Sequence, residues 1–434
     1  MRETKNQRLL IYQSVLWSVY YGLTSAFLIA FALALGASNT IIGIAGALPY
    51  LAAILAQVPG AKLVELYSRL HINVVLTVTS RLLWLPIVLI PVFFMKHPLL
   101  TLLIYFFLVQ FTEWLTNPAW TSFAGELVPM EHRGKFFGKR NMFMGIAGLT
   151  VSVFGAMYLD LFPKTSYVGF STMFLVGVLF GLWSSYYYSK MKERPYLDNK
   201  RHKIIEFFKI KGQFRRFIYI IIFFNFAFMF ASPFFIVYML KNIQISYTLM
   251  MISFAVAGLC KIMAHPHFGR VSDKIGDRPV AIVSMFGVAL VPILFFFVTP
   301  QTVWLIFVAQ IVSGIFWAGV EISTFNLLLD FSHQHRTVKV AKYVMLTSIP
   351  LIIAPIAGGF VADKAVFILS GIPLIFIISA LLRATSAMFM FSIKEPRIKK
   401  KHKLGQIVHE LATVHPIQGI GHTVSGIKKL FRTP

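Results

Sequence analysis

The stretch that decides the fold is Gly269-Arg270-Val271-Ser272-Asp273-Lys274-Ile275-Gly276-Asp277-Arg278-Pro279, which lies between apolar runs at about 245–265 and 280–298. Each run is long enough to cross a bilayer as a helix, which needs roughly 20 apolar residues. The stretch is therefore predicted to be a tight polar loop joining two spanning helices. Gly269 and Gly276 allow close backbone approach or a positive φ. The bases hold the loop on the cytoplasmic side.

This stretch follows the pattern G-x-x-x-D-[RK]-x-G-x-[RK], which resembles the loop signature of the major facilitator superfamily. In that family the signature joins helices 2 and 3, and again helices 8 and 9. The matching positions are Gly269, Asp273, Lys274, Gly276 and Arg278. Asp277 stands where the family usually has a base. The resemblance implies a gating role for Asp273, which would meet a positive helix start near Lys139-Arg140 and favour the outward-facing state.

A second stretch adds to the resemblance. Asn117-Pro118-Ala119-Trp120, followed by Val128-Pro129, Arg133-Gly134 and Lys139-Arg140, is similar to the junction of helices 4 and 5 in many members, mostly prokaryotic proteins of unassigned substrate. It places Arg133 among the predicted gating residues. The resemblance covers about residues 9–392 and implies a transport fold without naming a cargo.

Composition indicates a membrane protein. Of 434 residues, 57% are hydrophobic and 13% are charged, whereas soluble domains have about 25% charged residues. The formal net charge of +25 lies in short loops and at both ends, as membrane orientation requires, which argues against nucleic acid as a partner. The single cysteine, Cys260, excludes an intrachain disulfide. The run after Arg8 is too long for a signal peptide core and is interpreted as the first span.

Twelve apolar segments follow one another, and helices are the only form that satisfies their backbone groups in lipid. Their predicted bounds are about 9–35, 39–60, 73–95, 98–122, 141–161, 166–189, 214–240, 244–265, 280–298, 302–329, 340–362 and 366–392. We expect an all-α polytopic membrane protein with the family's twelve transmembrane helices in two pseudo-symmetric six-helix bundles. The predicted parts are a first bundle over 1–189, a basic linker over 190–213, a second bundle over 214–392 and a basic tail over 393–434.

The distribution of lysine and arginine predicts the orientation. The loops on one side hold only Lys96, Lys164, Lys241 and Lys364. This bias predicts a multi-pass protein of the cell membrane with both termini cytoplasmic. The segment 190–216 carries ten bases and the apolar piece 204–208, so it either contacts the anionic inner leaflet or is a solvated linker. The tail is expected to lie on the same leaflet.

The two halves resemble each other. A shift of 203 residues places His132-Arg133 on His335-Arg336, and Asp160 on Asp363. A near-constant offset of this kind indicates an internal repeat. The first-half counterpart of the signature, residues 60–69, keeps Gly60 and Arg69 but has lost the aspartate, which puts its stabilising or gating role in doubt.

Two acids lie on helices that, by the resemblance, line a central cavity. Glu113 falls within the fourth segment and Glu321 within the tenth. A charge at mid-bilayer costs about 2.5–3.5 kcal/mol on insertion scales, so such residues usually face a bundle interior or water. We hypothesise that Glu113 or Glu321 couples proton movement to transport, because burial favours a neutral carboxyl. The alternative is a structural carboxyl, hydrogen-bonded to a nearby helix or solvated near the inner surface.

Polar and aromatic residues accompany both acids. Gln110, Glu113 and Asn117 share one helix face, and Gln310, Gly314, Trp317 and Glu321 share another. These stripes predict a cavity for substrate and protons. Further candidates are Trp114, Trp120, Tyr20, Tyr21 and Asn225, with packing or lipid contact as the alternative for the aromatics.

The cations within spans are interpreted differently. Arg81, Arg383 and Lys261 lie near the inner surface and are expected to snorkel towards it, with an acid partner as the alternative for Arg81. Two histidine pairs are placed in inner loops, and more histidines in the tail: His265, His267, His333, His335, His402, His409, His415 and His422. Because no cysteine or acid cluster accompanies them, no metal site is expected.

The sequence predicts a secondary active transporter that moves a small solute by alternating access, is driven by protons and acts as a monomer. No phosphate-binding loop, zinc motif or catalytic constellation is found, so we expect neither an enzyme nor a cofactor. The alternative is an uncoupled uniporter, a lipid-moving protein or a sensor on the same scaffold.

Overall fold

The structure is a computed structural model that describes residues 4–129, 132–164, 166–193, 212–332, 336–364 and 371–395. Several predictions concern residues outside these ranges: the apolar piece 204–208, most of the linker and tail with their lipid contacts, and His333, His335, His402, His409, His415 and His422. The described residues form helices and no strand. The predicted all-α class is confirmed.

Twelve stretches of the described residues are long and apolar enough to cross a membrane, which confirms the predicted number. Three stretches contain breaks, after Leu23, after Leu82 and after Met229. The helices are α1 (Lys5–Leu23), α2 (Leu28–Ala34), α3 (Asn39–Leu66), α4 (Arg69–Leu82), α5 (Leu85–Val88), α6 (Ile90–Phe93), α7 (Pro98–Leu127), α8 (Arg133–Leu159), α9 (Val168–Ser189), α10 (Gly212–Met229), α11 (Phe234–Val237), α12 (Tyr247–Ile275), α13 (Asp277–Phe296), α14 (Trp304–Phe331), α15 (Arg336–Lys364) and α16 (Ile372–Met390).

The chain forms two compact units. Unit 1 comprises Met1–His202, Ile236–Met251 and Pro355–Asp363, and unit 2 comprises Lys203–Phe235, Ile252–Ala354 and Lys364–Pro434. Three helices therefore run from one unit into the other: the short α11 passes from unit 2 into unit 1, α12 begins in unit 1, and α15 ends in it. We call the end of each unit at which α1 or α10 begins the basic end, and the opposite end the far end.

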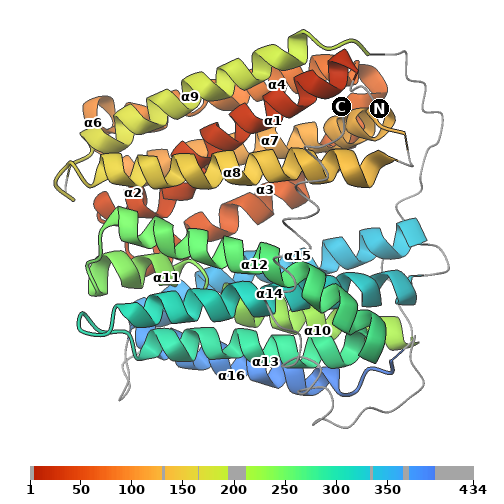
Figure 1. Cartoon of the computed structure of the whole chain (residues 1–434). Helices are drawn as coiled ribbons and strands as arrows, with labels where there is room; N and C mark the ends of the chain where they lie inside the picture. Colours follow the sequence, from red (N-terminus) through yellow and green to blue (C-terminus); the bar gives the residue numbers. More distant parts are fainter. Residues whose placement is uncertain are drawn as a thin grey trace, which may run out of the picture. The chain divides into compact units, whose positions relative to one another are not determined.

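In unit 1, α1 packs between α8 and α9, and α7 packs against α3 and α4 (Figure 1). Small residues permit these contacts, as is usual where apolar helices meet in lipid. Gly181 of α9 faces α4, and a Cβ there would lie 2.6 Å from Arg81 Cδ. This close approach leaves space for the arginine side chain between α4 and α9.

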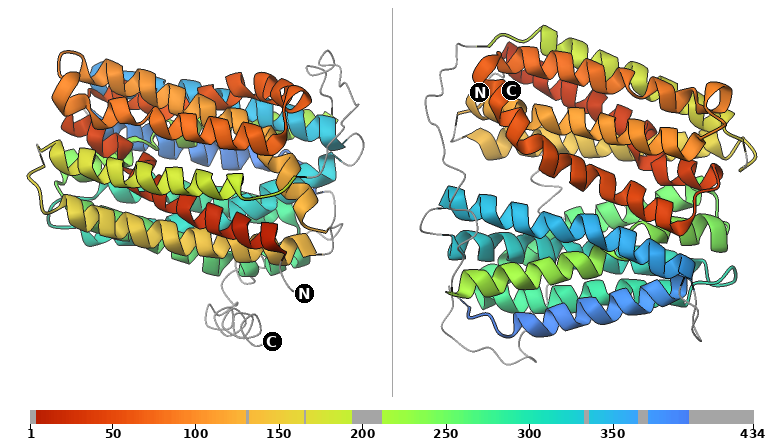
Figure 2. Two further views of the ribbon diagram at one scale, coloured as in Figure 1. Left: turned by 90° about the horizontal axis from the view of Figure 1, so that it is seen from above. Right: turned by 180° about the vertical axis from the view of Figure 1, so that it is seen from behind.

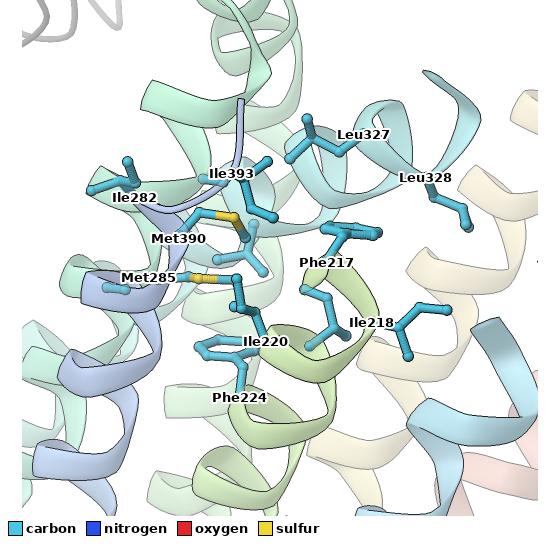
Figure 3. Close-up of a cluster of buried hydrophobic side chains, with 14 of the residues drawn as sticks. Phe217, Ile218, Ile220, Phe224, Ile282, Met285, Leu327, Leu328, Met390 and Ile393 are labelled. Atoms are coloured by element: carbon cyan, nitrogen blue, oxygen red, sulfur yellow. The ribbon is translucent and has the colours of Figure 1, made fainter. Parts of the chain in front are cut away.

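Unit 2 has its own apolar core, in which α13 packs against α14 and α16, and α10 against α16 (Figure 2). Figure 3 shows side chains from these four helices converging, with Phe217 and Phe224 of α10 near Met285 of α13 and Met390 of α16. The core joins helices that are distant in sequence and gives α10 and α14 a fixed support.

The opening stretch is not a loop. α12 continues to Ile275 and α13 begins at Asp277, so Gly276 alone makes the turn, with φ of 96°. His265 and His267, predicted to lie in a loop, are inside α12. Hydropathy marks only the part of a helix that lies in the membrane, whereas the backbone remains helical through the polar turns beyond it. The predicted positive φ is confirmed at Gly276, and Gly269 lies in the helix.

Candidate functional site

Glu113 lies at the centre of a polar cluster in unit 1. Its Oε1 forms an ion pair with Arg81 Nη1 and accepts hydrogen bonds from Tyr20 Oη at 3.1 Å and Ser80 Oγ at 3.3 Å. Trp84 Nε1 donates in turn to Tyr20 Oη at 2.6 Å. One carboxylate midway along α7 therefore joins α1, α4 and α7.

Arg81 is the buried partner that this carboxylate requires. Its side chain is 1% exposed, and its guanidinium carbon lies 3.9 Å from the centre of the Tyr20 ring. The prediction that Arg81 snorkels to the surface is wrong, and the alternative of an acid partner is confirmed. A cation that is removed from water must be compensated by a counter-ion or by hydrogen bonds, and Glu113 becomes available to Arg81 only because α4 and α7 pack together.

The other candidates of unit 1 lie around this cluster. Gln110 is buried one turn before Glu113, and Trp114 and Asn117 are half-buried. Tyr21 is 44% exposed and stacks on Trp17, with ring centres 5.4 Å apart. Their place in a substrate cavity stays a prediction.

Glu321 faces two bases of α12 in unit 2. Its Oε1 lies 2.6 Å from Lys261 Nζ, and its Oε2 lies 3.3 Å from His265 Nε2. Lys261 and His265 are one turn apart and so share a helix face. The side chains of Lys261 and Glu321 are 39% and 43% exposed, compared with 16% for Glu113. Lys261 is therefore held by an acid, which the snorkelling interpretation missed.

The two nitrogens of His265 face different acceptors. Nδ1 lies 2.8 Å from the Lys261 carbonyl oxygen, and Nε2 faces the Glu321 carboxylate. A neutral imidazole carries one N–H and can donate to one acceptor. The arrangement is satisfied when either His265 or Glu321 carries an additional proton. The contact between His265 and Glu321 can therefore accommodate one additional proton between α12 and α14.

A pocket of about 370 Å³ opens beside these residues. Three polar side chains, Lys261, Ser313 and Glu321, contribute to its wall. Its apolar wall contains Trp317 and Phe228, whose rings pack edge to face with centres 4.9 Å apart. A charged pair next to an aromatic wall suits a small solute with both polar and ring surfaces.

Two other candidates of unit 2 support this region. Gln310 is buried on α14. Asn225 Nδ2 donates to the Thr347 carbonyl oxygen at 2.9 Å and so ties α10 to α15. Whether Gln310, Asn225 and Trp317 contact substrate stays a prediction.

Arg383 is also buried, which makes the snorkelling prediction wrong here too. Its side chain is 2% exposed and donates to Ser379 Oγ at 3.1 Å, to Val288 O at 3.1 Å and to Phe228 O at 3.3 Å. Carbonyl oxygens thus satisfy this guanidinium. Pro292 leaves the Val288 carbonyl without a helical donor, a signal that the sequence contains.

Comparison with known proteins assigns the family. The model of the Major Facilitator Superfamily matches residues 9–240 and 217–434. The chain belongs to this superfamily. A tetracycline resistance protein, class D, of Salmonella ordonez is 27% identical over 157 residues, which are 36% of this chain and 37% of that protein. The uncharacterized MFS-type transporter YitZ of Bacillus subtilis (strain 168) is 28% identical over 132 residues, 30% of this chain and 79% of that protein.

Solved structures of superfamily transporters share the fold. The nucleoside transporter NupG superposes with a TM-score of 0.68 at 13% identity, over 92% of this chain and 100% of that chain. A D-xylose-proton symporter gives a TM-score of 0.68 at 15% identity, over 91% of this chain and 99% of that chain. This chain matches only 37% of the length of the tetracycline resistance protein. The match therefore does not assign that protein's activity to this chain.

In the superfamily signature of unit 2, the buried acid is Asp277 and not the signature aspartate, Asp273. Asp273 is exposed, whereas Asp277, where the family usually has a base, is buried. Asp277 Oδ1 accepts from Ser272 Oγ and, at 2.8 Å, from Asn326 Nδ2. Asp277 thus ties the turn to α14. The gating contact expected of Asp273 near Lys139-Arg140 stays a prediction.

Two glutamates at the basic ends occupy corresponding positions. Glu193 accepts from the backbone amides of Arg69 and Leu70 at the start of α4, at 3.3 Å and 3.1 Å, and Glu395 accepts from that of Arg278 at the start of α13, at 2.8 Å. The Arg69 side chain pairs with Glu193 at 2.5 Å and with Glu126 at 2.8 Å. The first copy of the signature therefore keeps a buried ionic tie although it lacks the aspartate.

Arg133, a predicted gating residue, lies against the end of α7. Its guanidinium donates to Gly125 O and, at 3.1 Å, to Val128 O. These carbonyls lie in and just beyond the last turn of α7, where helical donors are lacking. Arg133 therefore holds the α7–α8 connection, and its gating role stays a prediction.

Proposed function

We propose that this protein is a secondary active transporter that moves a small solute by alternating access and is driven by protons bound at the Glu321–His265 pair. The observation that carries the proposal is the pair of acceptors facing the two nitrogens of His265. Histidine is the side chain that ordinarily titrates between pH 5 and 8. A proton bound there changes the charge of the pocket wall at physiological pH.

The pocket supports coupling between this proton and a solute. Glu321 and Lys261 line the pocket directly, and His265 contacts both the Glu321 carboxylate and the Lys261 carbonyl oxygen. A solute that binds to Lys261 or displaces it from Glu321 changes how strongly the pair holds its proton, and the proton changes solute affinity by the same factor. The names of a tetracycline resistance protein and a D-xylose-proton symporter agree with a small-molecule cargo and a proton.

The orientation follows from the charge distribution. We place both termini and the basic ends in the cytoplasm, since the loops of the far ends carry few bases. The basic segments beyond the helices would then face the anionic inner leaflet. The protein would act in the cell membrane as a monomer.

The test begins with a thermal-shift screen of the purified protein for a stabilising solute. Uptake of that solute is then measured in reconstituted vesicles with and without an imposed pH gradient. We expect Glu321→Gln and His265→Asn to abolish gradient-driven accumulation while retaining exchange of solute across the membrane. His97→Asn, at an exposed histidine at the start of α7, is the matched control and should behave as wild type.

Three outcomes would contradict the proposal. Accumulation that survives in both variants would place the coupling proton elsewhere, with Glu113 as the next candidate. Uptake by the wild type that ignores the pH gradient would favour the uncoupled uniporter. Absence of any solute flux in the wild type would favour the lipid-moving or sensor alternatives.

A further inference from the structure

At the far end of unit 1, an aspartate that follows α8 accepts from the start of α12. Asp160 Oδ1 accepts from the backbone amide of Tyr247 at 2.8 Å, and Oδ2 from that of Thr248 at 2.9 Å. Ser246 Oγ accepts from the next amide, that of Leu249, at 3.1 Å. The first three amides of α12 are thus satisfied, two of them by a residue that lies 87 and 88 positions away in the sequence.

A second aspartate does the same for α3. Asp363, near the end of α15, accepts from the backbone amide of Asn39 at 3.1 Å and from that of Thr40 at 2.8 Å. The side chains of Asn39 and Thr40 donate to the same carboxylate at 2.9 Å and 2.7 Å. Ser38 Oγ accepts from Ile41 N at 3.3 Å, as Ser246 does in α12.

The two arrangements are copies related by the internal repeat. Asp160 and Asp363 are the residues that a shift of 203 superposes. A carboxylate is unfavourable at the C-terminus of its own helix and favourable at the N-terminus of another. Each aspartate is therefore placed to stabilise a contact between helices rather than the helix that carries it. We call these two contacts the twin caps.

The cap on α3 lies where two backbones nearly touch. A Cβ added at Gly43 would lie 2.1 Å from Pro355 O, and one at Gly359 would lie 2.4 Å from Asn39 O. Neither position accepts a larger side chain without moving α3 away from α15. Glycines on both helices thus permit the approach that the carboxylate needs.

Each cap joins segments from the two halves of the sequence within unit 1. α12 leaves unit 1 after Met251, and α15 enters it at Pro355. A displacement of unit 2 would be carried along these two helices to their capped ends. A movement of unit 2 must therefore bend α12 and α15 near these positions or release the caps.

We propose that the twin caps are a latch that closes the far end of the transporter and must open in each cycle. The inference rests on the proposed function only in requiring that this end opens. Release returns two amides per helix to water and leaves each carboxylate at the unfavourable end of its own helix. Asp160 and Asp363 thereby set the balance between the closed and open states of this end.

The test measures that balance directly, without solute or proton gradient. Spin labels are placed at Lys96→Cys and Gln301→Cys, exposed positions in far-end loops of unit 1 and unit 2, in a Cys260→Ser background. Double electron–electron resonance then gives the populations of short and long distances. We expect the long-to-short ratio to rise roughly 5-fold with Asp160→Ala or Asp363→Ala and roughly 25-fold with both, as for two independent lost caps.

Three further variants keep the test decisive. Asp363→Asn keeps its shape and one acceptor oxygen, so its shift should be smaller but in the same direction. Gly359→Leu should open the same end without removing a charge. Glu65→Gln, which neutralises an exposed acid at the basic end of α3, should leave the distances unchanged.

The proposal is overturned if the double alanine variant has the wild-type distance distribution, or if Glu65→Gln shifts it equally. The proposed function fails separately, in the vesicle assay. A protein that shows the distance shift but no proton-driven uptake would keep the latch and lose the coupling proposal.

Discussion

Arg383 Nη1 donates to the carbonyl oxygen of Val288 at 3.1 Å, the acceptor that Pro292 deprives of its helical donor. Pro292 lies within α13, and proline supplies no N–H to the carbonyl four residues before it. A buried cation without a carboxylate partner among the described contacts is thereby held by backbone oxygens. The arginine and the proline form one structural unit across two helices.

Replacing Arg383 should destabilise the protein, because the Val288 carbonyl oxygen then has no hydrogen-bond donor. Arg383→Ala leaves the Val288 carbonyl without its donor, and a buried unsatisfied group costs about 1–3 kcal/mol. We expect a marked fall in the thermal midpoint of the purified protein. In Pro292→Ala the helix can supply the missing donor, so Arg383→Ala should cost less in that background. Equal losses in both backgrounds would show that Val288 is not the acceptor that matters.

The two carboxylate pairs should differ in strength because they differ in exposure. Glu113→Ala leaves Arg81 buried and unpaired, which typically costs about 3–5 kcal/mol. Lys261→Ala breaks the more exposed pair with Glu321, for which about 1 kcal/mol or less is expected. Thermal unfolding of the two variants in one detergent gives the comparison. A larger loss of stability for Lys261→Ala than for Glu113→Ala would contradict this ranking of the two ion pairs.

The two aspartates of the signature should separate stability from gating. Asp277→Ala removes the acceptor of Ser272 and Asn326, so the thermal midpoint should fall by the equivalent of about 1–3 kcal/mol. Asp273→Asn changes an exposed residue and should leave the midpoint unchanged. If Asp273 has the gating role that the family resemblance implies, Asp273→Asn should also shift the distances between the spin labels at positions 96 and 301. An unchanged distribution would exclude that role.

The turn at Gly276 should not tolerate even the methyl group of alanine. Its φ of 96° is one that side-chain-bearing residues rarely adopt, and a Cβ there would lie 2.6 Å from Glu395 Cδ. Gly276→Ala should therefore destabilise unit 2 by about 1–3 kcal/mol and disturb the Glu395 contact with Arg278. Gly269→Ala is the control, since a Cβ there would meet no described atom within 4 Å beyond its chain neighbours and the adjacent backbone of its own helix. Equal midpoints for the two variants would contradict the expectation.

The extent of what the sequence predicted is clearest at three places. Hydropathy located the twelve spans, because each span is a local run of apolar residues. It ended α12 about ten residues early, because polar residues beyond the membrane remain helical. The offset of 203 paired Asp160 with Asp363, but the helix starts that these residues cap lie far away in the chain.

The candidate site shows the same division. The cost of a charge in lipid singled out Glu113 and Glu321, and that cost is a property of the residue alone. Their partners, Arg81, Lys261 and His265, were interpreted separately, because spacing along one helix says nothing about the neighbouring helix.

By itself the sequence determined that the chain spans a membrane twelve times in two related halves, since chain-local hydropathy and an internal repeat carry that information. Only the tertiary structure decided which charges neutralise one another and which helix start each aspartate caps. Those contacts depend on helix packing, which brings together residues that no local pattern connects.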